Sequence, residues 1–350
     1  MRTFSRCFAW LLLPMTLLLS GCVSRGPSDL TQDRLGYTMA MSTSWEQQLL
    51  LNIVRLQYAE APTFVEVTSI VGSYERNFGF SVGGEGAANS QKFVEQNISA
   101  GIDGRFIERP TITFLPLTGD KFTRQLMEPV PAQVVLSVIQ SGWRADRVLA
   151  TLCRAMNGVR NHFPRMDTIT PADPEFAQLM GLLQKLQDAN ALEFRSDSTD
   201  RRICMVINGG KGNDSPEMTE LRRLLKLKDA QNIFPIRSGV MIADEGEIAF
   251  STLSMFQVLL WLGDGIEFQD ENHPLVRIRN RGEARNSPMR IYSGTTRPDD
   301  AYVAVKHGKH WFWVSNDDPV SKSALMTICL VMKALESGDA QKPVLTIPTR

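Results

Sequence analysis

The sequence predicts an α+β fold of mixed helices and antiparallel strands, arranged as two interleaved lobes. Apolar residues recur at helical spacing in several stretches, and residues 44–57 are the clearest of them. Other short stretches alternate apolar and polar residues, which is typical of half-buried strands. Two such stretches, residues 192–195 and 201–207, flank a short polar turn, which favours antiparallel hairpins over parallel crossovers.

The N-terminus has the features of a bacterial lipoprotein signal. Arg2 and Arg6 form a short basic region, residues 8–19 are almost wholly apolar, and Cys22 follows two small residues. The apolar run has the length of a signal-peptide core and is shorter than the about 20 residues that a membrane-spanning helix needs. We therefore expect residues 1–21 to be a cleaved signal peptide and Cys22 to be lipidated. An ordinary secretory peptide or an uncleaved anchor is the alternative.

Lipid on Cys22 would attach the chain to a membrane. A diacylglycerol thioether on the thiol and a third chain on the new amine exceed the two signals that stable anchoring requires. Cys22 is followed by Val23 rather than by Asp, which favours the outer membrane over inner-membrane retention. The expected location is the periplasmic face of the outer membrane. Residues 22–43 are polar and are expected to form a flexible tether.

Residues 44–163 are the predicted N-terminal lobe. Its first helix is expected to begin at Ser44, because Ser44 and Gln47 fit a capping box. The strands of this lobe are predicted at residues 63–70, in a glycine-rich ribbon at residues 74–100, and at residues 109–115. Its further helices are predicted at residues 120–127, 132–140 and 144–157.

Residues 164–350 are the predicted C-terminal lobe, because prolines cluster at the boundary. Ser215 and Pro216 fit the N-cap and first position of a helix, as Asp318 and Pro319 fit the start of the last helix. Helices are predicted at residues 175–189, from Ser215 to about residue 227, within residues 248–262, and from Asp318 onward. Strands are predicted at residues 192–195, 201–207, 238–242, 275–278, 289–292, 301–305 and 311–314, and a short strand is predicted at the start of residues 248–262, ahead of the helix.

Charge and cysteine content limit the classes of function. Lys plus Arg and Asp plus Glu both total 38, so the chain lacks the basic footprint of a nucleic-acid-binding protein. After Cys22 no apolar run reaches membrane-spanning length. Cys153, Cys204 and Cys329 each have apolar neighbours, so we expect buried thiols, with a single disulfide as the alternative.

No set of residues predicts a catalytic, metal or cofactor site. The glycine-rich stretches at residues 83–86 and 208–212 lack the spacing of a phosphate loop. His307 and His310 are three residues apart in a predicted turn, whereas a metal site needs three or four convergent ligands. An acidic group, Asp244, Glu245 and Glu247, is also expected in a turn. We expect no metal and no cofactor, and a non-enzyme is favoured over an enzyme.

Two pairs of residues near the C-terminus are the candidate binding residues. Trp311 and Trp313 alternate with Phe312 along one predicted strand, so both indoles lie on one face. We expect this face to pack in the core against the last helix. The alternatives are a binding platform or a face that contacts lipid. Asp317 and Asp318, a few residues further along the chain, complete the candidate set.

Several short motifs occur in an order that spans most of the chain after Cys22. They lie at residues 52–58, 64–67, 110–119, 122, 124, 140–143, 297–298, 301–305, 311–313, 317–318 and 321–322. Together they resemble a group of uncharacterised proteobacterial outer-membrane lipoproteins. The resemblance implies a lipoprotein with a shared fold, and it implies no activity.

The favoured functional hypothesis is a lipid-anchored periplasmic envelope protein that binds or assembles an envelope protein partner without catalysis. A second hypothesis is an envelope hydrolase, acting on cell wall or glycan, that uses carboxylates in a cleft between the lobes. A third is a lipid or peptidoglycan binder that uses the face of Trp311 and Trp313.

Overall fold

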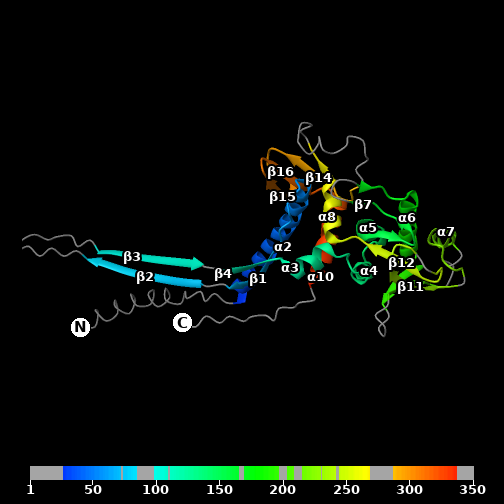
Figure 1. Cartoon of the computed structure of the whole chain (residues 1–350). Coiled ribbons are helices and arrows are strands. Elements are labelled where there is room, and N and C mark those ends of the chain that lie inside the picture. The colour runs from blue at the N-terminus through cyan, green and yellow to red at the C-terminus, as the bar shows by residue number, and fades with distance from the viewer. Residues whose placement is uncertain are drawn as a thin grey trace, which may run out of the picture. The chain divides into compact units, whose positions relative to one another are not determined.

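The computed structural model shows an α+β protein, as predicted (Figure 1). It describes residues 27–71, 74–84, 98–108, 111–164, 169–196, 203–208, 215–229, 231–241, 244–268 and 287–336. The predicted signal peptide and Cys22 therefore lie outside the described residues. By internal contacts the chain divides into residues 1–46 and residues 47–350.

The first helix, α2 (Pro27–Gln57), begins far ahead of the predicted start at Ser44. The prediction of a flexible tether was wrong for residues 27–43, which are helical, and Ser44 is an exposed residue inside the helix. The sequence has no proline between Pro27 and Pro62, so nothing stops the helix there, and its polar first half shows no apolar stripe by which it could be recognised. The predicted stripe in the second half is confirmed, because Leu49, Leu50, Ile53 and Val54 are fully buried.

A long antiparallel hairpin follows α2. Strand β1 (Val65–Val71) pairs with β4 (Thr111–Pro116), and β2 (Tyr74–Gly84) pairs with β3 (Ile98–Glu108). Val71 pairs with Thr111, and Tyr74 pairs with Glu108. Tyr74 comes three residues after Val71 and Glu108 three residues before Thr111, so both ladders share one register. The predicted ribbon is confirmed for its first strand, whereas its second strand, β3, extends to Glu108, beyond the predicted end at residue 100. Residues 85–97 lie outside the described residues.

Four short helical segments connect this hairpin to the largest sheet. They are α3 (Gly119–Phe122), the π-helix η1 (Thr123–Met127), α4 (Ala132–Gln140) and α5 (Ala145–Leu152). The helix predicted at residues 144–157 was wrong in its last part, because Cys153–Met156 forms strand β5. Ala155 and Met156 pair there with β12 (Ile248–Thr252), the short strand predicted at the start of residues 248–262. The two strands are about a hundred residues apart, so local periodicity does not reveal that they pair.

The largest sheet has six strands in the order β6-β5-β12-β11-β10-β9. Its other members are β6 (Val159–Arg160), β11 (Ile233–Ser238), β10 (Ile203–Ile207) and β9 (Leu192–Ser196). β11 and β12 are parallel and the other neighbours antiparallel. The sheet combines strands from both predicted lobes: β5 and β6 precede the predicted boundary at residue 163, and the other strands follow it. The strand predicted at residues 238–242 was misplaced, since β11 ends at Ser238 and a bend follows.

Two helices of this region were predicted correctly. α6 (Pro174–Asp188) buries the predicted stripe that includes Phe176, Leu179 and Leu183. α7 (Pro216–Leu225) begins with Pro216 at its first position, and the Ser215 side chain accepts a hydrogen bond from the Met218 N–H at 3.1 Å. A small pair, β7 (Phe163–Pro164) and β8 (Ile169–Thr170), lies between β6 and α6 in the sequence.

The last part of the chain contributes a buried helix, a second sheet and the final helix. α8 (Met255–Gly263) has the capping box of Ser254 and Gln257 at its start. The second sheet has the order β13-β14-β16-β15, and α10 (Pro319–Glu336) follows it. Its strands are β13 (Ile266–Glu267), β14 (Ile291–Gly294), β16 (His310–Ser315) and β15 (Ala301–His307). The strand predicted at residues 275–278 lies outside the described residues.

No disulfide joins Cys153, Cys204 and Cys329, the cysteines of the described part of the chain. Cys153 is fully buried as expected, whereas Cys204 and Cys329 are half-buried. Burial raises the pKa of the Cys153 thiol far above its ordinary value, so this thiol stays protonated.

Candidate binding site

The second sheet positions the two predicted tryptophans on one of its faces. Along β16, Phe312 and Val314 are fully buried, whereas Trp311 and Trp313 are half-buried. Successive side chains of a strand point to opposite faces, so the indoles share the face away from the core. The prediction of one common face is confirmed, and the favoured prediction of core packing was wrong, because Phe312 and Val314 occupy the core side.

Strand β14 adds an aromatic group to the indoles, and the loop between β14 and β15 adds a cationic group. Tyr292 of β14 is paired with Trp313, and the two rings stack with centroids 5.9 Å apart and planes at 26°. The Arg297 guanidinium carbon lies 5.6 Å from the Trp311 ring centroid, within cation–π range. We call Tyr292, Trp311, Trp313 and Arg297 the aromatic face. It is an amphipathic surface of the kind that is enriched at protein interfaces.

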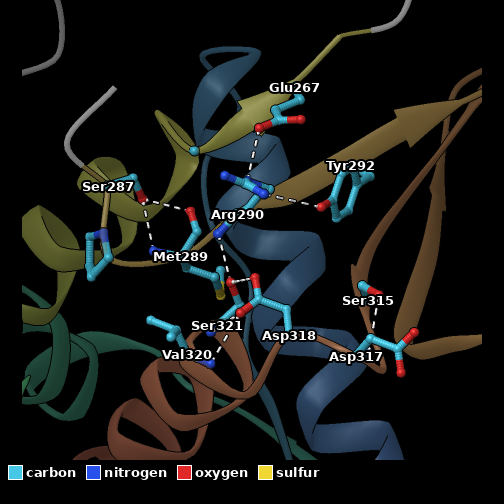
Figure 2. A pocket seen from close by; sticks show the side chains of 12 residues that line it. Glu267, Ser287, Met289, Arg290, Tyr292, Ser315, Asp317, Asp318, Val320 and Ser321 are labelled. Atoms are coloured by element: carbon cyan, nitrogen blue, oxygen red, sulfur yellow. Dashed lines mark hydrogen bonds and ion pairs between the residues drawn. The ribbon is translucent and has the colours of Figure 1, made fainter. Parts of the chain in front are cut away.

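A pocket of about 560 Å³ adjoins this face at Tyr292 (Figure 2). It lies between the end of β13, the residues that lead into β14, the end of β16 and the first turn of α10. Its polar lining residues are Glu267, Ser287, Arg290, Tyr292, Ser315, Asp317, Asp318 and Ser321. We call it the Arg290 pocket.

Arg290 connects three elements around this pocket. Its Nε atom is 3.0 Å from Glu267 Oε1 of β13, and its Nη1 atom is 3.5 Å from the Tyr292 hydroxyl. Its backbone N–H donates to Ser321 Oγ of α10 at 2.8 Å. Figure 2 shows the guanidinium between the Glu267 carboxylate and the Tyr292 ring. The side chain is largely exposed, so this ion pair contributes little to stability.

Asp318 is the N-cap of α10. Its Oδ1 atom accepts the backbone N–H groups of Val320 and Ser321 at 3.0 and 3.1 Å, and Ser321 Oγ donates to Oδ2 at 2.6 Å. Partial burial would raise the pKa of Asp318, but these hydrogen bonds and the charge of Arg290 together hold it below its ordinary value. Asp318 is therefore an ionised structural residue that also lines the pocket.

The other predicted aspartate is placed differently. Asp317 is exposed, and its backbone N–H donates to Ser315 Oγ at 3.2 Å. Its carboxylate points away from the Arg290 and Asp318 group in Figure 2.

The structure brings the predicted residues into one region. Trp313 contacts Tyr292, and Tyr292 lines the same pocket as Asp317 and Asp318. Trp311 lies on the same face but is not among the residues that line the pocket.

Sequence reasoning missed three members of this region, namely Glu267, Arg290 and Tyr292. Tyr292 ended a predicted strand, and its place beside Trp313 depends on strand order. Glu267 and Arg290 are far apart in the sequence, so no local pattern pairs them.

Among the residues that the structure describes, no three His, Cys, Asp or Glu side chains are grouped so as to hold a metal ion. The described helices include none that is both long enough and apolar enough to cross a membrane. Comparison of the chain with protein-family models, curated proteins and solved structures finds no match.

Proposed function

We propose that this protein is a lipid-anchored envelope protein that docks an envelope protein partner on its aromatic face. The anchor is lipid on Cys22, and the location is the periplasmic face of the outer membrane. The basic and apolar N-terminus and the small residues before Cys22 support this part of the proposal.

The observation that carries the binding role is the outward position of Trp311 and Trp313. Tryptophan, tyrosine and arginine are the residues that most often contribute large shares of binding energy at protein interfaces. Here Trp311, Trp313, Tyr292 and Arg297 occur together on one sheet face, opposite the core.

The hydrolase alternative would use carboxyl groups with raised pKa values, at least one of which acts as an acid. The carboxyl groups of Glu60, Glu220 and Asp244 have lowered pKa values, mainly because they bond to His307, Arg223 and Lys228. Asp318, which lines the Arg290 pocket, also has a lowered pKa and is engaged as a helix cap. These directions suit ionised structural carboxylates, and we therefore favour binding over hydrolysis.

A photo-crosslinking experiment tests the proposal in native envelopes. Lys306 is exposed and is paired with Trp311 across β15 and β16, so a photoreactive residue at position 306 samples the aromatic face. We expect it to capture one envelope protein, with the capture lost in Trp311→Ala and reduced in Cys22→Ala. A photoreactive residue at Lys226, the exposed C-cap of α7, is the matched control.

Two results would contradict the proposal. Equal capture from positions 306 and 226 would show that the contacts are unspecific. Capture of glycan or lipid alone at position 306 would contradict a protein partner and favour a lipid or peptidoglycan binder. Thermal unfolding of Trp311→Ala should match that of the wild type, which confirms that lost capture is not lost folding.

A further inference from the structure

A second cavity shares no lining residue with the aromatic face or the Arg290 pocket. It has a volume of about 420 Å³ and lies between the turn joining α4 to α5 and the first turns of α10. Its lining residues are Ser141, Gly142, Trp143, Arg144, Arg147, Pro319 and Ser323. Cavities that hold small molecules in proteins usually measure about 300–1,000 Å³. We call this cavity the Arg147 pocket.

The side-chain amide of Gln187 holds the backbone of this pocket in place. Gln187 of α6 accepts the Ala145 N–H at 2.9 Å and donates to the Trp143 carbonyl at 3.0 Å. Gly142 has a φ of 100°, a conformation that side-chain-bearing residues rarely adopt. The backbone is therefore held by hydrogen bonds on both sides of Arg144, and little ordering would be required when a ligand binds.

The two arginines of the pocket have different electrostatic surroundings. Arg144 donates to both carboxylate oxygens of Asp146 at 3.0 and 2.8 Å, and these bonds raise its pKa. The Arg147 guanidinium, half-buried on α5, makes no hydrogen bond and no ion pair with any residue of the described chain. Of the two positive charges in this pocket, that of Arg147 is therefore the one that a bound anion would neutralise.

Backbone donors at the start of α10 do not compete for this role. Pro319 lines the pocket and has no N–H, and the N–H groups of Val320 and Ser321 are taken by Asp318. Ligand recognition here depends on side chains. A guanidinium binds carboxylate and phosphate oxygens through two parallel hydrogen bonds. Trp143, which also lines the pocket, offers a flat ring.

We propose that the Arg147 pocket binds an anionic group, carboxylate or phosphate, joined to a small polar body that lies against Trp143. An acidic sugar and a phosphorylated lipid headgroup both carry this chemistry. Arg147 binds the anion, Arg144 keeps its bond to Asp146, and Ser323 lines the same cavity.

Calorimetric titration of the purified full-length chain in detergent tests this proposal. The probes are D-glucuronate, glycerol 3-phosphate and, as the neutral counterpart of the first, D-glucose. We expect one of the two anions to bind at least about tenfold more tightly than D-glucose, since a hydrogen bond to a charged group contributes about 1.5–3 kcal/mol. Preference for D-glucuronate identifies an acidic sugar as the source, and preference for glycerol 3-phosphate a lipid headgroup.

Matched variants assign the binding to this pocket. Arg147→Gln should weaken anion binding about tenfold, and Arg147→Lys, which keeps the charge but not the fork, should weaken it less. Lys309→Gln removes one charge in the exposed β15–β16 turn and should leave binding unchanged. Absence of binding by both anions, or equal binding by wild type and Arg147→Gln, would overturn the proposal.

Discussion

Asn52 and Thr63 exchange two hydrogen bonds, each 2.8 Å long, between the Asn52 side-chain amide and the Thr63 backbone N–H and carbonyl. Gln48, one helical turn earlier on α2, does the same for Val65, with distances of 2.7 and 3.1 Å. Residues four apart on a helix share a face, and alternate residues of an extended chain share an edge. The helix therefore acts as a partner for the strand edge at the base of the hairpin.

Replacing Asn52 should destabilise the protein. Asn52 is almost fully buried, and Asn52→Ala leaves the Thr63 backbone groups without partners, which should cost about 1–3 kcal/mol. Urea unfolding, monitored by far-ultraviolet circular dichroism, measures this cost. The control is Gln133→Ala on the exposed side of α4, and an equally small effect of both substitutions would contradict the structural role of Asn52.

Asp318 should make stability fall in acid. Its pKa in the folded state is below the ordinary value of 3.8, so its contribution is complete above pH 3.8 and is lost as the pH falls through the folded-state pKa. Asp318→Asn keeps a good N-cap residue but cannot titrate. The urea midpoint of the wild type should thus decline more steeply below pH 4 than that of Asp318→Asn, and parallel declines would refute the assignment.

Cys153 should be unreactive in the folded protein. Its thiol is fully buried and its raised pKa keeps it protonated, whereas the thiolate is the form that alkylates. Iodoacetamide labelling followed by peptide mass spectrometry should find Cys153 modified only after denaturation. Cys204, which is half-buried, is the internal comparison. Rapid native labelling of Cys153 would show that this part of the sheet opens.

Two glycines should respond in opposite directions to alanine. A Cβ at Gly265 would collide with the Met289 carbonyl beside the Arg290 pocket, so Gly265→Ala should destabilise the chain. Gly181 is exposed in the middle of α6 with open space around it, so Gly181→Ala should stabilise by about 0.5–1 kcal/mol. Thermal unfolding of both variants should shift in opposite senses, and a shared sign would contradict the close approach at Gly265.

Much of the fold was predictable from local signals. Pro216 after Ser215 fixed the start of α7, and Pro319 after Asp318 fixed the start of α10, because capping residues and a first-turn proline act within one helical turn. The alternation of Trp311, Phe312 and Trp313 correctly placed both indoles on one face. The α+β class itself follows from these local periodicities.

Long-range partners decided what the sequence by itself left open. Residues 153–156 continue an apolar pattern that suits a helix, yet they form β5 because β12 offers them a hydrogen-bonding edge. Which face of β16 is the core, and which residues join Asp317 and Asp318 around the Arg290 pocket, depended on strand order and on the position of α10. Side-chain periodicity defines two faces of a strand, whereas only tertiary packing determines which of them is covered.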